Sequence, residues 1–336
     1  MDVLIAAGGL SRGRRSREKG ALRPARRPDS SGPPPSIAPP RAPSVRVDAN
    51  GVEWLPVPGW EKLPWLWHGF STRRGGVTRA YSAPGGQGEL NLGFTAGDDR
   101  QAVVRNRQLL AEAVTVNLET AIVTLKQIHS NVVVRTGAAD CESEPRRADG
   151  QMTAESGLLL GIMTADCIPV LVADRRRRTV AAFHAGWRGT VKRIVECGIG
   201  CMRLEFGSRP EDLIAAIGPG IGACCYAVGE EVRAAFESQF AYAPELFSEV
   251  YDPDPVRLKY PMLFLNQRAP GHAAPLLSLH LDLTKANRRQ LLDAGLKPGQ
   301  IQCVGGCTSC QTGRFFSHRA EHGHTGRMMA VIGIRG

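Results

Sequence analysis

The sequence predicts an α/β protein with a mixed sheet or sheets. From about residue 50 onward, short apolar runs alternate with segments of helical periodicity, which is the pattern of strands separated by helices. Hydrophobic residues make up 43% of the 336 residues and charged residues 22%, so the chain can bury a sizeable core.

The strands are expected where apolar runs end at turn residues. We predict strands at residues 66–70, 121–125, 131–134, 158–163, 168–173, 179–183, 213–217 and 328–334. The four arginines at 175–178 separate two of these runs and predict an exposed hairpin turn. Residues 240–280 are rich in proline, and we interpret them as a long irregular loop or insertion.

Three helices follow from capping residues and apolar periodicity. The first begins after Asp98 or Asp99 and runs to about residue 113. The second begins at Thr190, and the third follows Asp282 as its cap. The second helix has one apolar face, which consists of Val191, Ile194, Val195, Ile199 and Met202.

The N-terminal residues 1–45 are predicted to be a disordered tail. They are rich in Arg, Pro, Ser and Gly and lack apolar periodicity, so their folding would bury too little surface to offset the loss of entropy. Residues 1–46 carry ten basic and three acidic residues, hence +7 of the net +10, which leaves +3 for the rest. Such a tail is usually a solvated arm, so we expect no specific nucleic-acid binding.

Other compartments and partners are disfavoured by composition. No stretch approaches the eighteen consecutive apolar residues of a membrane span. The nine cysteines do not have the spacing of a small secreted disulfide framework, so a reducing cytoplasm is expected.

Three residues that can bind a metal lie at the ends of predicted strands or just beyond them. They are His129, Cys167 and His184, and strand ends are where α/β proteins place their sites. Two imidazoles and a thiolate suit zinc and leave a fourth position for water or substrate. The alternative is a buried cysteine and two hydrogen-bonded histidines without mutual contact. Spacing alone favours this alternative, because the three lie far apart in the chain.

The segment His184-Ala185-Gly186-Trp187-Arg188-Gly189-Thr190 contains a second candidate function, anion binding. Arg188 lies beside the predicted helix start at Thr190, and a helix N-terminus with an arginine suits a phosphate or carboxylate. A plain strand–turn–helix corner with Trp187 in the core is an equally good interpretation.

Two further segments carry residues of weaker signal. Arg73 follows the apolar run 66–70 and is a candidate anion contact, and Asn91 lies in a similar polar segment. Cys307 and Cys310 form a lone CxxC with Cys303 nearby, for which packing is favoured over a metal or redox role. Residues 218–222 lack the dinucleotide-binding pattern and are interpreted as a structural turn.

Several of these segments together resemble the YfiH-like family, also called the laccase-domain or polyphenol-oxidase family. The resemblance runs from about residue 53 to the C-terminus and omits the tail. The motifs are His68-Gly69-Phe70-Ser71-Thr72-Arg73, Leu90-Asn91-Leu92-Gly93, Gln127-Ile128-His129, Thr164-Ala165-Asp166-Cys167, His184-Ala185-Gly186-Trp187-Arg188-Gly189, Ile217-Gly218-Pro219 with Cys224-Cys225-Tyr226, and Thr325-Gly326-Arg327-Met328.

The resemblance implies a layered α/β fold with mixed sheets and one catalytic domain over residues 46–336. It implies that His129, Cys167 and His184 hold a zinc ion, with copper as the alternative metal, and act in catalysis. The implied activities are purine nucleoside phosphorylase on adenosine, inosine and methylthioadenosine, and adenosine deaminase. Arg73, Asn91 and Arg188 are the expected contacts to nucleoside and phosphate. A monomer or small homo-oligomer is expected.

Three other functions compete with this one. A copper-dependent polyphenol oxidase needs many histidines in paired arrangements, whereas this chain has eight and only one HxH, His322-Gly323-His324. A metal-free cysteine hydrolase would use Cys167 as nucleophile and His184 as base. Only the basic tail favours a non-enzymatic interaction protein.

Overall fold

Two six-stranded mixed sheets dominate the structure, a computed structural model that describes residues 45–83, 85–251 and 277–336. The first sheet has the order β1 (Arg46–Val47), β2 (Glu53–Leu55), β3 (Leu66–Ser71), β16 (Met328–Ile334), β8 (Leu158–Thr164) and β5 (Ala121–Thr124). The second has the order β15 (Ile301–Cys303), β11 (Leu213–Ile217), β9 (Ile168–Asp174), β10 (Thr179–Ala185), β7 (Gly150–Thr153) and β6 (Val133–Arg135).

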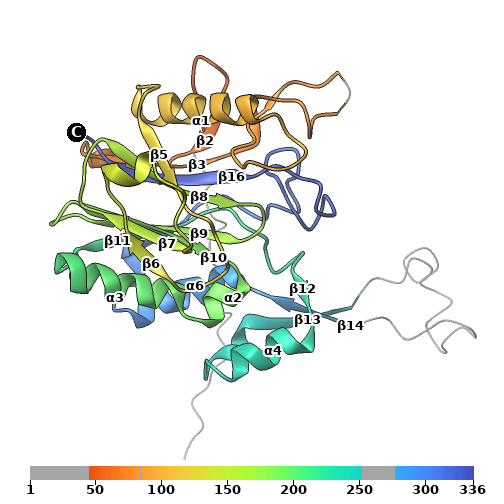
Figure 1. Cartoon of the computed structure of the whole chain (residues 1–336). Coiled ribbons are helices and arrows are strands. Elements are labelled where there is room, and N and C mark those ends of the chain that lie inside the picture. Colours follow the sequence, from red (N-terminus) through yellow and green to blue (C-terminus); the bar gives the residue numbers. More distant parts are fainter. Residues whose placement is uncertain (1–44, 84, 252–276) are drawn as a thin grey trace, which may run out of the picture. The chain divides into compact units, whose positions relative to one another are not determined.

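The two sheets are packed face to face, and helices cover their outer faces (Figure 1). Helix α1 (Arg100–Thr115) lies on the first sheet, while α3 (Ile194–Phe206) and α6 (Leu283–Asp293) lie on the second. This arrangement gives four layers and three buried apolar clusters: one between the sheets and one beneath the helices on each side. The predicted α/β class with mixed sheets is confirmed.

The central strands are buried on both faces, which explains why they appear as unbroken apolar runs. In β9, Val170 and Val172 face the helices, whereas Leu171 and Ala173 face the other sheet. The predicted strands match β3, β5, β6, β8, β9, β10, β11 and β16 to within two residues at each end. The arginines at 175–178 form the turn between the antiparallel strands β9 and β10, as predicted.

Two helix starts were predicted correctly and one was wrong. The carboxylates of Asp99 and Asp282 accept hydrogen bonds from the first turns of α1 and α6. The helix predicted from Thr190 is instead two helices, α2 (Trp187–Val191) and α3, separated at Arg193. Arg193 has a φ of 61°, and its guanidinium binds Glu196 and stacks on Phe240, so tertiary contacts bend the chain there.

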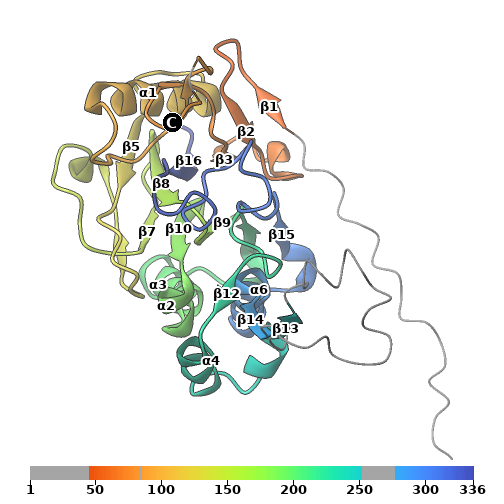
Figure 2. The same cartoon turned by 90° about the vertical axis from the view of Figure 1, so that its right-hand side faces the viewer.

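The irregular region predicted for residues 240–280 is partly wrong. Its ends form β13 (Phe247–Tyr251) and β14 (Leu277–Leu281), which pair antiparallel, and β12 (Ala227–Val228) completes a third sheet (Figure 2). The alternation of leucine with polar residues in β14 was a strand signal that the surrounding prolines obscured. Residues 252–276 lie outside the described part.

The remaining elements are short. They are β4 (Arg74–Thr78), α4 (Glu230–Glu237) and the single-turn helices at Trp60–Lys62, Ala138–Cys141, Pro210–Asp212, Ala243–Leu246 and Pro298–Gln300. The tail predicted for residues 1–45 also lies outside the described part, apart from Val45. Among the described helices, none combines the length and apolar character needed to cross a membrane.

Candidate metal centre

The chain passes between the two main sheets twice along the same edge, and each crossing carries one candidate ligand. Strands β5 and β8 are parallel, so their carboxyl ends meet at one edge of the first sheet. The chain then crosses to β6 through His129 and to β9 through Cys167. Strand β10 ends beside the start of β9, where His184 lies opposite Pro169. The topology therefore brings together residues that are far apart in sequence.

The three donor groups form one compact set. The Sγ of Cys167, one ring nitrogen of His129 and one of His184 all lie within 4.8 Å of one another. The distance from Cys167 Sγ to His129 Nε2 is 3.9 Å, and the two imidazole centroids are 4.9 Å apart. His184 is buried, Cys167 is half-buried and His129 is exposed, so the set is open to solvent on the His129 side.

A buried carboxylate, Asp149, organises two of the three groups. It lies next to β7, directly across from His184, and its Oδ1 is 2.9 Å from Nδ1 of that histidine. Because a carboxylate only accepts, Nδ1 carries the proton and Nε2 is left to face Cys167. The same carboxylate accepts the backbone N–H of His129 at 2.9 Å and that of Ser130 at 2.6 Å. Asp149 thereby holds His129, which has a φ of 57°, in its left-handed conformation.

The electrostatics of this group favour a charged pair when no metal is present. Burial opposes the thiolate, but the charge of His184 and hydrogen bonds from both imidazoles lower the pKa of Cys167 to about 6. Burial likewise opposes the imidazolium, but the Cys167 thiolate and Asp149 raise the pKa of His184 to about 9. The His184 and Ser130 hydrogen bonds hold the pKa of Asp149 below its usual range despite burial.

The residues fit a zinc ion. Tetrahedral coordination with the usual bond lengths separates a nitrogen ligand from a sulfur ligand by about 3.6 Å, close to the observed 3.9 Å. Gly186 leaves this space free, because a Cβ there would lie 2.8 Å from Cys167 Sγ and 3.1 Å from His129 Cδ2. Only a glycine at this position allows thiol and imidazole to converge.

A second buried carboxylate, Asp166, lies immediately before Cys167 and anchors the surrounding loops. Its Oδ1 accepts the hydroxyls of Thr308 at 2.6 Å and Ser317 at 2.7 Å, and its Oδ2 accepts the backbone N–H of Arg319 at 2.7 Å. Asp166 has a φ of 89°, which is unusual for a non-glycine residue. These hydrogen bonds hold the strained residue in place and so position Cys167.

Arg188 and Arg319 flank the metal ligands on the solvent side. Arg188 is exposed in α2, only four residues after His184, and its guanidinium lies 4.4 Å from the Trp187 ring centroid. Arg319 stacks on Tyr226 at 5.2 Å. Burial and the negative charge of Cys167 raise the pKa of Tyr226 to about 12, which both arginines oppose. Tyr226 therefore shares one electrostatic environment with the thiol and both guanidinium groups.

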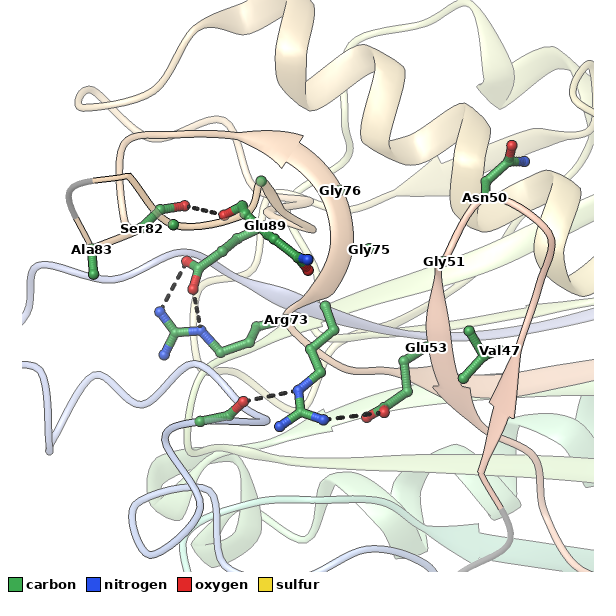
Figure 3. Close-up of a pocket in the computed structure, with 15 residues that line it drawn as sticks. Val47, Asn50, Gly51, Glu53, Arg73, Gly75, Gly76, Ser82, Ala83 and Glu89 are labelled. Carbon is green, nitrogen blue, oxygen red and sulfur yellow. Dashed lines mark hydrogen bonds and ion pairs between the residues drawn. The ribbon is translucent and has the colours of Figure 1, made fainter.

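Arg73 lies in a different environment. Its guanidinium binds Glu89 with two hydrogen bonds of 2.8 and 2.9 Å, and Glu321 with one of 2.9 Å. Figure 3 shows Arg73 and Glu89 at the wall of a cavity of about 550 Å³, none of whose lining residues is a candidate metal ligand. The donors of Arg73 are thus occupied by carboxylates, and its predicted role as a substrate contact stays a prediction.

Asn91 is also fully engaged by protein groups. Its amide donates to the Gly93 carbonyl and to Asp98, and its oxygen accepts the backbone N–H groups of Gly93 and Arg327. The side chain is completely buried. It joins the segments around residues 91 and 327, and its predicted substrate contact likewise stays a prediction.

Four residues at this edge were not identified from the sequence. Asp149 and Asp166 position the ligands, while Tyr226 and Arg319 lie beside them. Asp166 and Tyr226 belong to motifs recognised in the sequence, but nothing in their spacing indicated a contact with Cys167. The only available signal was an Asp next to each crossing, and isolated aspartates are more often caps or turns.

Comparisons with known proteins place the chain among relatives that share this edge. A family model described as multi-copper polyphenol oxidoreductase laccase matches residues 67–335. Purine nucleoside phosphorylase YlmD of Geobacillus stearothermophilus is 36% identical over 274 residues, which are 80% of this chain and 89% of that protein. Purine nucleoside phosphorylase YfiH of Escherichia coli is 33% identical over 281 residues, 83% of this chain and 98% of that protein.

The fold is shared with solved structures as well. The crystal structure of YlmD from Geobacillus stearothermophilus aligns with a TM-score of 0.69 and 31% identity. That alignment covers 88% of this chain and 100% of the other.

Proposed function

The chain belongs to the YfiH-like, laccase-domain family, and from this premise we propose that it is a zinc-dependent purine nucleoside phosphorylase. The proposed substrates are adenosine, inosine and methylthioadenosine, together with inorganic phosphate. Adenosine deaminase is proposed as a second activity of the same site. The observation that carries the proposal is the convergence of His129, Cys167 and His184 at an edge that is open to solvent.

Zinc held by these three residues supplies Lewis-acid polarisation and an open coordination position for a reacting oxygen. Asp149 keeps His184 in the tautomer whose Nε2 faces the thiol. The lowered pKa of Cys167 means that its sulfur is already a thiolate at neutral pH, as a ligand must be. The preorganised ligand set therefore needs little rearrangement to bind the ion.

Phosphorolysis requires that phosphate and nucleoside be held in line. A phosphate oxygen forms the bond to the ribose anomeric carbon while the bond from that carbon to the purine nitrogen breaks, and the purine leaves with a proton. We assign phosphate binding to Arg188, because its guanidinium is exposed and lies four residues after a ligand. Phosphate is then oriented by a planar, permanently charged donor that has no carboxylate partner among the described residues.

Deamination differs in its attacking group. A water oxygen adds to the purine carbon that bears the amine, and ammonia leaves. Phosphate takes no part in this reaction, so Arg188 should matter little to it. The two activities should therefore separate on mutation of Arg188 and disappear together on loss of a ligand.

The test measures both products with zinc-loaded protein and adenosine. With phosphate we expect adenine and ribose-1-phosphate, and without it inosine. Arg188→Ala should lower phosphorolysis roughly ten- to a hundredfold, as loss of a charged hydrogen bond of about 1.5–3 kcal/mol does, and change deamination much less. Cys167→Ala should abolish both.

Arg203→Ala is the matched control, because Arg203 is an exposed arginine of α3 outside the candidate site. It should change neither activity. Equal loss of both activities in Arg188→Ala, in protein that keeps its zinc, would remove Arg188 from the phosphate role. Full activity in Cys167→Ala would refute the metal-dependent function.

A second candidate function, a metal-free cysteine hydrolase, is favoured by one observation. Cys167, His184 and Asp149 have the order of nucleophile, base and orienting carboxylate that nucleophilic catalysis uses. The two proposals differ in their response to zinc. A hydrolase loses activity when zinc covers the thiol, whereas the phosphorylase gains it.

A further inference from the structure

Four cysteine thiols outside the candidate metal centre lie together at the end of the second sheet. Cys224 and Cys225 follow β11, and Cys307 and Cys310 follow β15. Cys310 Sγ is 3.4 Å from Cys224 Sγ and 3.3 Å from Cys225 Sγ, and all four sulfur atoms lie within 4.8 Å of one another. All four are free thiols, and two of them are exposed.

The backbone, and not a chance contact of side chains, builds this cluster. Strands β11 and β15 are parallel neighbours, so their following loops leave the sheet at the same edge. Pairing continues beyond the strands at Gly220 and Cys307, where the N–H of Thr308 donates to the Gly220 carbonyl at 3.0 Å. The two cysteine pairs are thereby held opposite each other.

The cluster also has the surroundings of thiolate ligands. The backbone N–H of Gly222 donates to Cys307 Sγ at 3.2 Å, a contact that supports a negatively charged sulfur. A Cβ at Gly222 would lie 3.1 Å from Cys307 Cβ and 3.2 Å from Cys224 Sγ, so a larger residue would push the thiols apart.

The distances and the donor type select the ligand. Four thiolates around one zinc ion at the usual bond length are separated by about 3.8 Å, within the observed range of 3.3 to 4.8 Å. Four soft sulfur donors prefer zinc to hard cations. Cys310 is nearly equidistant from Cys224 and Cys225, which suits a shared central ion better than one covalent pair.

We propose that Cys224, Cys225, Cys307 and Cys310 form a second, structural zinc site of the four-cysteine type. The site joins two loops that both end on Asp166, the residue before Cys167. One loop donates the N–H of Ile221 to the Asp166 carbonyl at 2.8 Å, and the other supplies Thr308 to its carboxylate. Zinc at the cluster therefore stabilises one wall of the catalytic edge. This inference holds whether or not the chain is a nucleoside phosphorylase.

The first test counts zinc per chain in the full-length protein, loaded with zinc and dialysed. We expect two ions in the natural chain and one each in Cys167→Ala and in the double variant Cys307→Ser/Cys310→Ser. Cys303→Ser is the matched control, an exposed cysteine four residues before Cys307 that lies outside both groups, and it should retain two. One ion in the natural chain that only Cys167→Ala removes would overturn the proposal.

The second test does not depend on the double variant folding. Cobalt(II) replaces zinc, and its thiolate charge-transfer absorption scales with the number of sulfur ligands. In Cys167→Ala this absorption should fall by about one fifth, since one of five thiolates is removed. Loss of nearly all of it would show that the four cysteines bind no metal. Mass analysis of the alkylated, non-reduced protein adds a further check, because a disulfide within the cluster, in place of four alkylated thiols, would also overturn the proposal.

Discussion

The region around Arg73 and the edge around Cys167 contain the same kinds of polar residue but use them differently. Arg73 spends its donors on Glu89, Glu321 and a backbone carbonyl, within a network that joins distant segments. At the other edge, His184 has one nitrogen bound by Asp149 and the other directed at a thiol, and Arg188 is exposed. Open donor and ligand capacity on a rigid frame distinguishes the candidate site from a structural network.

The largest difference between the two regions should appear in stability. Arg73→Ala leaves two mostly buried carboxylates without their partner, and we expect the free energy of unfolding to fall by about 3 kcal/mol. Arg188→Ala, at an exposed position, should change it by less than about 0.5 kcal/mol. Urea denaturation of both variants measures this contrast. Arg73→Ala protein of unchanged stability but weakened phosphate binding would return Arg73 to the substrate site.

The next largest effect concerns the reactivity of Cys167 in zinc-free protein. With its pKa lowered to about 6, the thiol should alkylate with a midpoint near pH 6, whereas an ordinary cysteine titrates near 9. At pH 7 the thiolate fraction should exceed that of an ordinary thiol by roughly ninetyfold. Alkylation by iodoacetamide, followed by peptide mass analysis, reports each cysteine separately. A midpoint near 9 for Cys167 would contradict the charged pair, and added zinc should protect this residue.

A smaller effect is expected from the orienting carboxylate. Asp149→Asn removes the acceptor that fixes His184 and the loop of His129, and zinc affinity at this centre should fall roughly ten- to a hundredfold. Competition with a chelator measures the affinity, and the four-cysteine cluster can be removed first to isolate one site. Asp293→Asn on α6 is a control for the loss of a surface carboxylate. Unchanged affinity in Asp149→Asn would show that the ligands are positioned without it.

The smallest effect is a change in the pH dependence of stability of the zinc-free protein. Cys167 has a lowered pKa, so its contribution is fully present above 9 and is lost as the pH falls through about 6. His184 has a raised pKa, so its contribution is fully present below 6.5 and is lost as the pH rises through about 9. Stability should therefore be highest between these limits. Thermal unfolding across this range in Cys167→Ala should show a flatter profile.

The sequence by itself determined the elements whose physical cause is local. Strands β8 to β11 and β16 are apolar runs that no other structure would bury, and Asp99 and Asp282 cap their helices through contacts within one turn. The candidate ligands were also identified from sequence, because histidine and cysteine at strand ends are few. Their spacing alone nevertheless favoured three unconnected residues.

Tertiary structure decided what depends on contacts between distant segments. Two crossings between sheets at the same edge bring His129 and Cys167 together, and the pairing of β7 with β10 places Asp149 beside His184. The lone CxxC gained a partner only because β11 and β15 are parallel neighbours, which aligns it with the adjacent cysteines 224 and 225. Periodicity records which face of an element is buried, but the register between strands arises from packing of the whole chain, and it is that register which assembled both cysteine-containing sites.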